Sequence, residues 1–448
     1  MNNNAKKPAA VIGAGLAGCE AAWRLAERGI PVDLIEMRPE KTTPAHQTGG
    51  FAELVCSNSL KASRVESASG LLKEEMRRLG SVLLPIADRC AVEAGGALAV
   101  DRLRFSRMAT ETVGGHPLIS IIRKEQEIIP DDEYEACVVA TGPLTDGAFA
   151  GAIDELCGGR LSFYDAAAPI VTAESLDMGE AFFASRYGRG GEEGYVNCPM
   201  DKEQYEAFYH ELISAERAVS HIDSDSDANG GPRVYEACMP VEIMARRGLD
   251  TIRFGPLKPV GLRDPRTGRR PWANLQLRRE DAAGRMYNLV GFQTNLKFGE
   301  QKRVFSMIPA LKNAEFVRYG VMHRNSFINS PGLLNGDFSL RGRPGLFFAG
   351  QITGVEGYME SAGSGILAGI NAARFILGEE PLILPGETML GALTRHVSDE
   401  SASDSRRDFQ PMGANFGILP PIEPHIRDKK ERCKALAERS LRRIAALE

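Results

Sequence analysis

The chain has 448 residues, a formal net charge of −5, and 43% hydrophobic and 25% charged residues. This composition is typical of a soluble globular protein, and the overall charge gives no indication of nucleic-acid binding. No stretch reaches the roughly 20 apolar residues that span a membrane, which excludes a membrane-embedded chain. The length predicts two domains, or one large α/β domain with an insertion.

The first 40 residues predict a strand, a glycine turn, a helix and a second strand. The apolar run 9–12 is followed by Gly13-x-Gly15-x-x-Gly18, and Glu36 ends the next strand. In a dinucleotide-binding unit these glycines make the tight turn, let the backbone approach the pyrophosphate, and let helix and strand pack closely. The helix N-terminus attracts phosphate, and Glu36 is placed to accept hydrogen bonds from ribose hydroxyls. We therefore assign the dinucleotide to Gly13, Ala14, Gly15, Leu16, Ala17, Gly18 and Glu36.

Two distant segments favour FAD as that dinucleotide. A strand over 135–141 ends at a Gly142-Pro143 turn, and an apolar strand over 346–350 precedes a glycine-rich loop and a helix from about 364 to 377. This layout resembles the second FAD motif of the glutathione-reductase-like superfamily, in which the helix N-terminus points at the flavin or its phosphates. The further FAD candidates are Gly142, Gly350, Gly357 and Tyr358. Because no second GxGxxG is present, NADPH or NADH is expected to bind only transiently, as the reductant.

The middle of the chain differs in charge from the rest. A helix is expected over 201–220, and residues 233–324 carry 18 Lys and Arg against 8 Asp and Glu. Such an asymmetry within an acidic protein favours an anionic partner, although a solvated basic face is an equally good interpretation of the charge alone.

The eight cysteines include no CxxC pair and no Cys/His cluster with zinc spacing. This pattern predicts no metal site and free thiols in a cytoplasmic protein. A free cysteine usually packs in the interior, so packing is the default role for each thiol. For Cys56, which is followed by polar residues, and for Cys238, the residues alone leave packing and catalysis equally open.

Long strings over almost the whole chain resemble the folate- and FAD-dependent tRNA (uracil-5-)-methyltransferases, the TrmFO family. The related wobble-uridine-modifying flavoproteins, GidA or MnmG, share the fold and lack these strings. The resemblance implies a glutathione-reductase-like FAD-binding Rossmann domain, residues 1–185 and 310–448, interrupted by a smaller, basic α/β insertion domain, residues 186–309, that faces RNA or substrate. The strings are FAELVCSNSLKA (51–62), GYVNCPMDKEQYEAF (194–208), YEACMPVEIMARRG (235–248), RFGPLKPVGLRDPRTGRRP (253–271), YNLVGFQTNLKFGEQKRVF (287–305), AEFVRYGVMHRNSFI (314–328) and GQITGVEGYMESAGSGILAGINA (350–372).

The reaction of this family methylates carbon 5 of the T-loop uridine of tRNA to give ribothymidine, with carbon from 5,10-methylenetetrahydrofolate and electrons from reduced FAD. Carbon 5 of uracil is a poor nucleophile, so a thiolate adds to carbon 6 and carbon 5 then attacks a methylene electrophile. A base next removes the carbon 5 proton, and flavin hydride reduces the exocyclic methylene that results. By resemblance, Cys238 is the nucleophile and Cys56, close to the flavin, is the general base, whereas Cys198 matches a family cysteine without a defined role.

The resemblance implies that the basic segment binds RNA, because its Arg and Lys side chains would contact the phosphates. The target uridine would be flipped out of its stack to reach the flavin and the thiol. The same motifs would serve chemistry on a ribosomal RNA uridine. Two further functions stay open, that of a small-molecule flavin oxidoreductase and that of a non-catalytic RNA-binding flavoprotein. The sequence implies no membrane and no protein partner. The RNA-binding candidates are Arg246, Arg247, Arg263, Arg266, Arg269, Arg270, Arg278 and Arg279.

Overall fold

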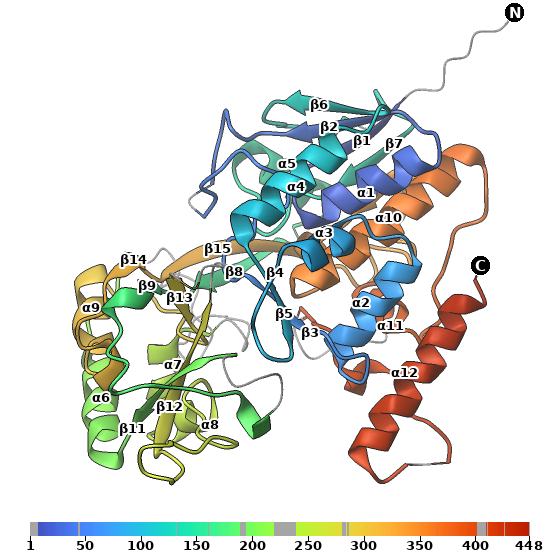
Figure 1. The fold of residues 1–448 in the computed structure, drawn as a ribbon. Helices are drawn as coiled ribbons and strands as arrows, with labels where there is room; N and C mark the ends of the chain where they lie inside the picture. The colour runs from blue at the N-terminus through green and yellow to red at the C-terminus, as the bar shows by residue number, and fades with distance from the viewer. Residues whose placement is uncertain are drawn as a thin grey trace, which may run out of the picture.

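The computed structural model describes residues 8–43, 45–130, 132–159, 161–188, 194–218, 239–279, 284, 286–400, 409, 411–424 and 426–447. These residues form two lobes, each around a hydrophobic core of its own (Figure 1). The described residues within 8–159 and 329–447 form the first lobe, and the described residues within 168–318 form the second. A pair of antiparallel strands joins them, β8 (Leu161–Ala167) and β15 (Val321–Ile328).

The first lobe is built on a five-stranded sheet in which every neighbouring pair is parallel. Buried apolar strands suit a sheet that helices cover on both faces, and the central strand β1 is buried along its whole length. In such sheets ligands bind outside the carboxyl ends of the strands. The strand order is β16 (Leu346–Phe348), β7 (Ala136–Val139), β1 (Ala9–Ile12), β2 (Val32–Glu36) and β6 (Ile119–Arg123).

Two helices, α1 (Leu16–Glu27) and α10 (Tyr358–Leu377), lie side by side beneath this sheet (Figure 1). A Cβ on Gly365 would lie 2.2 Å from the carbonyl oxygen of Ala17, and one on Gly369 would lie 2.7 Å from that of Ala21. Gly365 and Gly369 therefore serve the close approach of α10 to α1, not the approach of a ligand. The helix also begins earlier than predicted, at Tyr358 rather than near 364.

Two buried glutamates tie other helices of the first lobe together. Glu20 of α1 accepts the backbone N–H groups of Val82 and Leu83 at the start of α3 (Leu83–Arg89). Glu75 of α2 (Ala68–Arg78) accepts the N–H groups at the start of α11 (Met389–Ser398) and the hydroxyl of Ser440 in α12 (Lys429–Ala445). The lobe is completed by α4 (Arg102–Gly114), α5 (Gly147–Leu156) and a small antiparallel sheet of β3 (Ser59–Ala62), β5 (Ala97–Val100) and β4 (Ala91–Val92).

The second lobe is a six-stranded sheet in which every neighbouring pair is antiparallel. The strand order is β10 (Phe182–Phe183), β11 (Val196–Met200), β12 (Ala273–Arg279), β13 (Met286–Leu289), β9 (Ile170–Thr172) and β14 (Phe316–Arg318). The helices packed with it are α6 (Lys202–Ser214), α7 (Val241–Arg246), α8 (Thr251–Phe254) and α9 (Phe298–Phe305).

These features confirm the predicted fold class, an α/β dinucleotide-binding domain interrupted by a smaller α/β insertion. The sheet of the second lobe takes its strands from residues 170–318, a wider range than the predicted 186–309. The flanking strands β9 and β14 are short and pair with each other, so their membership of this sheet depends on a long-range pairing that a local pattern does not contain.

Candidate functional site

The turn after β1 places its three glycines in three different surroundings. Gly13 adopts a φ of 99°, and a Cβ there would lie 2.6 Å from the carbonyl oxygen of Ala140. A Cβ on Gly18 would lie 1.7 Å from the carbonyl oxygen of Gly13, so α1 begins in direct contact with the turn. A Cβ on Gly15 would meet nothing within 4 Å. The three positions thus serve the turn, the packing of the helix, and the approach of a ligand.

The start of α1 fits a phosphate group. Gly15 is the N-cap residue, and no side chain caps the helix. The N–H groups of the first helical turn lack partners within the helix, and the helix dipole adds positive character at the same end. Open space beside Gly15 and an uncapped helix N-terminus are the features that hold the pyrophosphate of a dinucleotide.

Glu36, at the end of β2, holds this turn in place. Its carboxylate accepts the N–H of Ala14 at 2.8 Å and the N–H of Arg38 at 3.0 Å, and the Arg38 guanidinium donates to both oxygens at 2.9 and 3.1 Å. Burial acts to raise the pKa of Glu36, but the hydrogen bonds and the charge of Arg38 outweigh burial and hold the pKa below its usual value. Because these four donors fill the acceptor sites of a carboxylate, a ribose hydroxyl would have to replace one of them.

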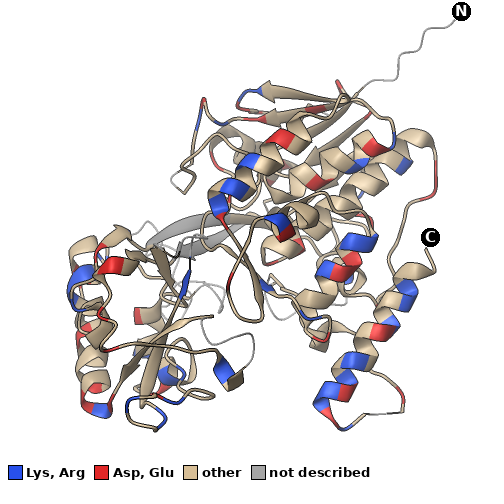
Figure 2. Cartoon of the chain, in the orientation of Figure 1, with Lys and Arg blue, Asp and Glu red and all other residues tan. Residues whose placement is uncertain are grey.

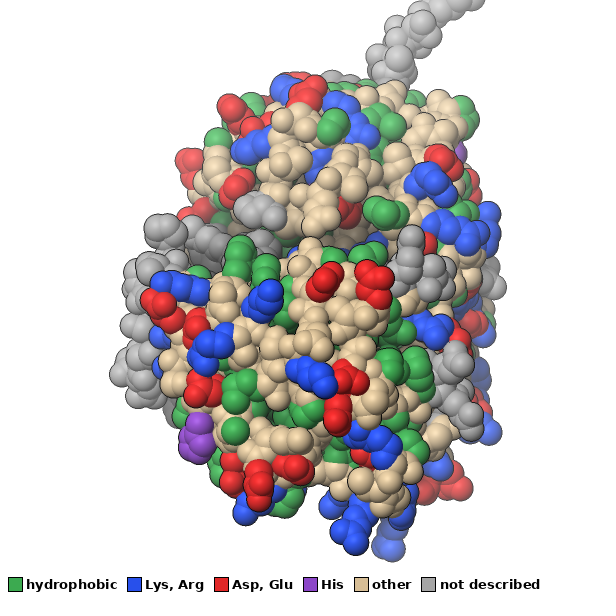
Figure 3. Space-filling model, turned by 60° about the vertical axis from the view of Figure 1, so that its left-hand side comes forward, with side chains coloured by type: hydrophobic (Ala, Val, Ile, Leu, Met, Phe, Trp, Pro, Cys, Tyr) green, Lys and Arg blue, Asp and Glu red, His purple; other side chains and the backbone are tan. Residues whose placement is uncertain are grey.

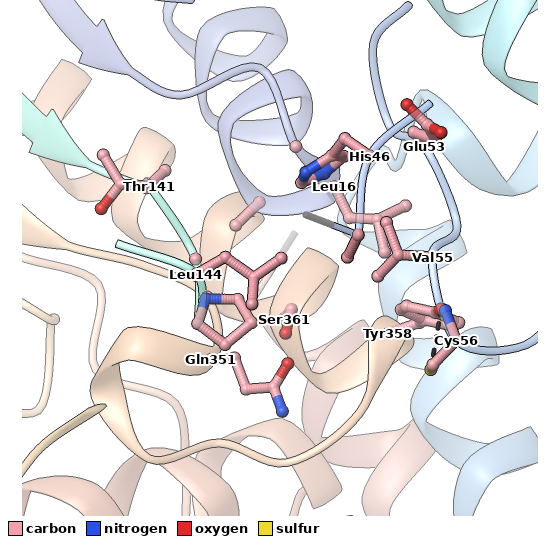
Figure 4. Close-up of a pocket in the computed structure, with 17 residues that line it drawn as sticks. Leu16, His46, Glu53, Val55, Cys56, Thr141, Leu144, Gln351, Tyr358 and Ser361 are labelled. Carbon is pink, nitrogen blue, oxygen red and sulfur yellow. Dashed lines mark hydrogen bonds between the residues drawn. The ribbon is translucent and has the colours of Figure 1, made fainter. Parts of the chain in front are cut away.

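A cleft runs along the carboxyl edge of the sheet, from Glu36 at one end to Cys56 and Tyr358 at the other. Figure 4 shows the end that includes Cys56 and Tyr358. Two adjoining pockets form it, and both include Gly15 and His46 in their walls. An extended cleft with a phosphate-binding turn at its middle suits a dinucleotide. Of the predicted FAD contacts, Ala14, Gly18 and Gly357 do not line the cleft. Those that line it are Gly13, Gly15, Leu16, Ala17, Glu36, Gly142, Gly350 and Tyr358.

The Cys56 thiol is half-buried at one end of this cleft, against the ring of Tyr358 (Figure 4). The Cys56 Sγ lies 3.0 Å from the Tyr358 hydroxyl oxygen. The same oxygen accepts the backbone N–H of Cys56 at 2.9 Å and that of Ser57 at 3.2 Å. Tyr358 is the first residue of α10, so the helix whose glycines pack on α1 also places this hydroxyl at the sulfur.

Three arginines from three different elements hold the loop that carries Cys56. Arg102, at the start of α4, donates to the carbonyl oxygens of residues 54 and 55. Arg318 of β14 donates to the carbonyl oxygens of residues 55 and 56 at 2.9 and 3.4 Å. Arg278 of β12 donates to Ser57 Oγ at 2.5 Å and to Asn58 Oδ1 at 3.0 Å. Two of the three arginines belong to the second lobe, so that lobe fixes the position of a thiol in the first.

Cys238, the predicted nucleophile, lies outside the described residues. Cys198 lies on β11, is fully buried, and has a pKa raised by burial alone, which is the environment of a packing cysteine. Four other cysteines are also buried, and of these Cys19 has its pKa raised mainly by burial. Among the described cysteines only Cys56 and Cys433 are partly exposed, and Cys56 alone lines the cleft.

Six of the predicted RNA-binding arginines are exposed at the surface of the second lobe. Arg246 donates to the carbonyl oxygen of Ile213, and Arg263 donates to that of Gly268. Arg247, Arg266, Arg269 and Arg270 are likewise exposed. On the face in view in Figure 3, Lys and Arg side chains alternate with Asp and Glu, as they do along the ribbon in Figure 2. The face in view is therefore mixed in charge (Figure 3), although the sequence segment 233–324 is strongly basic.

Three of the eight arginines are bound to side chains of the protein. Arg266 forms ion pairs with Asp264 at 2.9 Å and with Glu180 at 3.1 Å. Arg279 lies 3.4 Å from Glu93 of the first lobe. Arg278 is only 8% exposed and binds the Cys56 loop. The structure thus brings Arg278 to the end of the cleft that includes Cys56, and not to the outer surface.

Sequence reasoning missed three contributors to the site. Arg102 and Arg318 carry no local signal, because their role depends on carbonyl groups far along the chain. His46 has the sequence surroundings of a structural histidine, yet it lines both pockets while its Nδ1 lies 2.7 Å from Thr43 Oγ1. Its position after the second strand, in the loop that precedes Cys56, is the one hint that the sequence offers.

Neither a metal centre nor a membrane segment is found in the part of the chain that the structure describes. No group of three or more His, Cys, Asp or Glu side chains there is arranged to hold a metal ion. No helix among the same residues has the length and apolar character needed to cross a membrane.

The fold and the cleft define a dinucleotide-binding α/β protein, and comparisons with known proteins narrow this class. Residues 8–380 match the protein family described as "Glucose inhibited division protein A". A solved structure of GidA from Aquifex aeolicus superposes with a TM-score of 0.69 at 16% identity, covering 99% of this chain and 73% of that one. This likeness shows a shared fold.

Relatives of much higher identity are named "Methylenetetrahydrofolate--tRNA-(uracil-5-)-methyltransferase TrmFO". The protein of that name from Pelotomaculum thermopropionicum is 57% identical over 97% of both chains. The one from Listeria monocytogenes serotype 4b is 54% identical over 98% of both chains. The chain therefore belongs to the TrmFO family of methylenetetrahydrofolate--tRNA-(uracil-5-)-methyltransferases, within the GidA-related proteins.

Proposed function

We propose that this protein methylates carbon 5 of the T-loop uridine of tRNA, with methylenetetrahydrofolate as carbon donor, FAD as resident cofactor and NADPH or NADH as reductant. The observation that carries the proposal is the position of Cys56. A partly exposed thiol stands at the end of a dinucleotide cleft, in a chain that is 57% identical to a methyltransferase of this name. When bound, FAD supplies the hydride that converts the transferred one-carbon unit into a methyl group.

The residues present fit FAD. Gly15 and the uncapped start of α1 would hold the pyrophosphate, and Glu36 with Arg38 would lie at the ribose end. Leu16, Gly350 and Tyr358 line the opposite end and would face the flavin ring. This end of the cleft also includes Cys56, so the thiol would stand beside the ring.

Within this site, Cys56 acts as the general base that removes the proton from carbon 5 of the uracil. The assignment of Cys238 as the nucleophile at carbon 6 rests on the resemblance of the string 235–248. Arg278 and Arg318 join the second lobe to the first at the Cys56 loop. The second lobe, with Arg269 and Arg270 exposed on it, would bind the RNA backbone.

Tritium release tests both the reaction and its target. The substrate is an unmodified tRNA transcript carrying tritium at carbon 5 of uridine, with methylenetetrahydrofolate and NADPH added to the FAD-loaded protein. Release that requires folate and disappears when the T-loop uridine is replaced would support the proposal. Release from ribosomal RNA alone would move the target there. A flavin that NADPH reduces, with release from neither RNA, would favour a small-molecule oxidoreductase.

Cysteine variants separate the two thiol roles. Cys238→Ala should abolish covalent capture of tRNA that contains 5-fluorouridine. Cys56→Ala should retain capture but release tritium at least about 100-fold more slowly, since a positioned base contributes on that order. Cys433→Ala removes the other partly exposed thiol and is the matched control, expected to behave as wild type. If Cys56→Ala released tritium at the wild-type rate, Cys56 would be excluded as the base.

A further inference from the structure

The hydroxyl of Tyr358 has three neighbours at hydrogen-bonding distance, and only one arrangement of protons satisfies them. The backbone N–H groups of Cys56 and Ser57 both donate to the oxygen, at 2.9 and 3.2 Å. A hydroxyl has two acceptor lone pairs and one proton. Since the two N–H groups occupy both lone pairs, the remaining proton is directed at the third neighbour, Cys56 Sγ, at 3.0 Å.

We propose that Tyr358 is a positioning residue that donates its hydroxyl proton to Cys56 Sγ and so favours the thiolate form of that cysteine. A hydrogen bond donated to the charged form of a group stabilises that form. The distance of 3.0 Å between the Tyr358 hydroxyl oxygen and Cys56 Sγ is a length typical of N–H···O bonds. It is short for a sulfur acceptor, which is larger than oxygen, and charge-assisted hydrogen bonds are the shorter ones. The use of this thiolate as the base at carbon 5 rests on the proposed function.

The surroundings keep Tyr358 a donor. Burial, and after it the charge of Cys56, raise the pKa of the Tyr358 hydroxyl well above its usual value of 10. Tyr358 therefore retains its proton throughout the range in which a cysteine ionises. Its position is fixed because it begins the long helix α10, which packs along α1.

Two arginines near Cys56 act in the same direction as Tyr358. Arg102 is close enough to lower the pKa of Tyr358, and it bonds the backbone next to Cys56. The carbonyl oxygen of Cys56 faces Arg318, which brings a second positive charge to the same residue. Positive charge near a thiol favours its thiolate. Among the described residues, the groups that face Cys56 or its loop include Tyr358 of α10, Arg102 of α4, Arg278 of β12, Arg318 of β14, and His46 and Glu53 in the wall of the cleft.

The test is the pH profile of Cys56 alkylation in the FAD-loaded full chain, without RNA or folate. Iodoacetamide modification of the Cys56 peptide would be followed by mass spectrometry, with Cys433 as the internal reference thiol. In Tyr358→Phe we expect the midpoint of the profile to move to higher pH and the rate at pH 7 to fall about threefold, because only the thiolate reacts. Tyr134→Phe, which removes a hydroxyl bonded to Asp33, should leave the profile unchanged.

A second replacement separates donation from simple support of the loop. 3-Fluorotyrosine at position 358 keeps the hydroxyl and makes it a stronger donor, so the midpoint should move to lower pH than in wild type. An unchanged midpoint in Tyr358→Phe would overturn the proposal. If that variant does not fold, the 3-fluorotyrosine protein decides, and an unchanged midpoint there overturns it as well. If the wild-type protein released no tritium from tRNA while the alkylation midpoints shifted as expected, the proposed function would be contradicted and the role of Tyr358 would stand.

Discussion

The two lobes differ in how closely the sequence predicts the positions of their candidate functional residues. In the first lobe, the glycine turn and Glu36 lie where the motif places them, along one edge of a parallel sheet. In the second lobe, the basic residues divide between an exposed, charge-mixed surface and an interior contact with the Cys56 loop. A glycine motif encodes backbone geometry, which is local, whereas the function of an arginine depends on what lies opposite its long side chain.

The largest expected effect concerns the glycine turn of the first lobe. Gly18→Ala should destabilise the protein by about 3 kcal/mol or more and abolish FAD binding, because its Cβ would overlap the Gly13 carbonyl. Gly15→Ala should cost about 1 kcal/mol or less in stability. It should nevertheless weaken FAD binding at least about tenfold, because its methyl group would enter the space assigned to the pyrophosphate. Urea unfolding and flavin absorbance after desalting measure the two effects, and unchanged FAD affinity in Gly15→Ala would contradict this assignment.

The next effect separates Arg278 from the exposed arginines. Arg278→Lys removes the planar fork that bonds Ser57 and Asn58, so the Cys56 loop should lose its position. We expect tritium release to fall about 100-fold, as is typical when a catalytic group is displaced by about 1 Å. RNA affinity and its salt dependence should stay close to wild type. A parallel loss of RNA affinity would show that Arg278 binds phosphate after all.

A smaller effect is expected at the exposed arginines of the second lobe. Reversing both charges, Arg269→Glu with Arg270→Glu, should weaken RNA binding and reduce the slope of log affinity against log salt by about two. Filter binding at several salt concentrations measures the slope. The matched control is Arg266→Gln. Because Arg266 is already paired with Asp264 and Glu180, its replacement should leave the slope unchanged. Equal slopes in wild type and the double variant would remove this surface from the RNA interface.

The smallest effect concerns the stability of the first lobe. Burial raises the pKa of Glu75 to about 7, above the value near 4.5 of an unfolded chain. The native state then binds more protons than the unfolded state between these values, so stability should decline as pH rises from about 4.5 to about 7 and level off above that. Glu75→Gln should flatten this decline, as seen in thermal melts across pH. Burial also raises the pKa of Glu20 to about 7, so Glu20→Gln should flatten the decline in the same way. Parallel curves in wild type and both variants would show that these glutamates remain ionised.

Much of the site can be predicted without the structure. Patterns of strand, turn and helix assign Gly13, Gly15, Glu36, Gly142, Gly350 and Tyr358 to the dinucleotide, and all six line the cleft. The glycines of α10 are harder to interpret, because a glycine that permits helix packing and one that admits a ligand look alike in a sequence. Only the neighbouring atoms distinguish them.

The sequence by itself determined the family, the fold class and the glycine turn, because these depend on residue types at short, fixed spacings. The tertiary structure decided what surrounds Cys56. Tyr358 lies about 300 positions from Cys56 in the chain, and Arg278 and Arg318 lie more than 200 positions from it, yet all four meet at one loop. Hydrogen bonds act over about 3 Å and are independent of chain separation, so no local pattern encodes which side chains meet there.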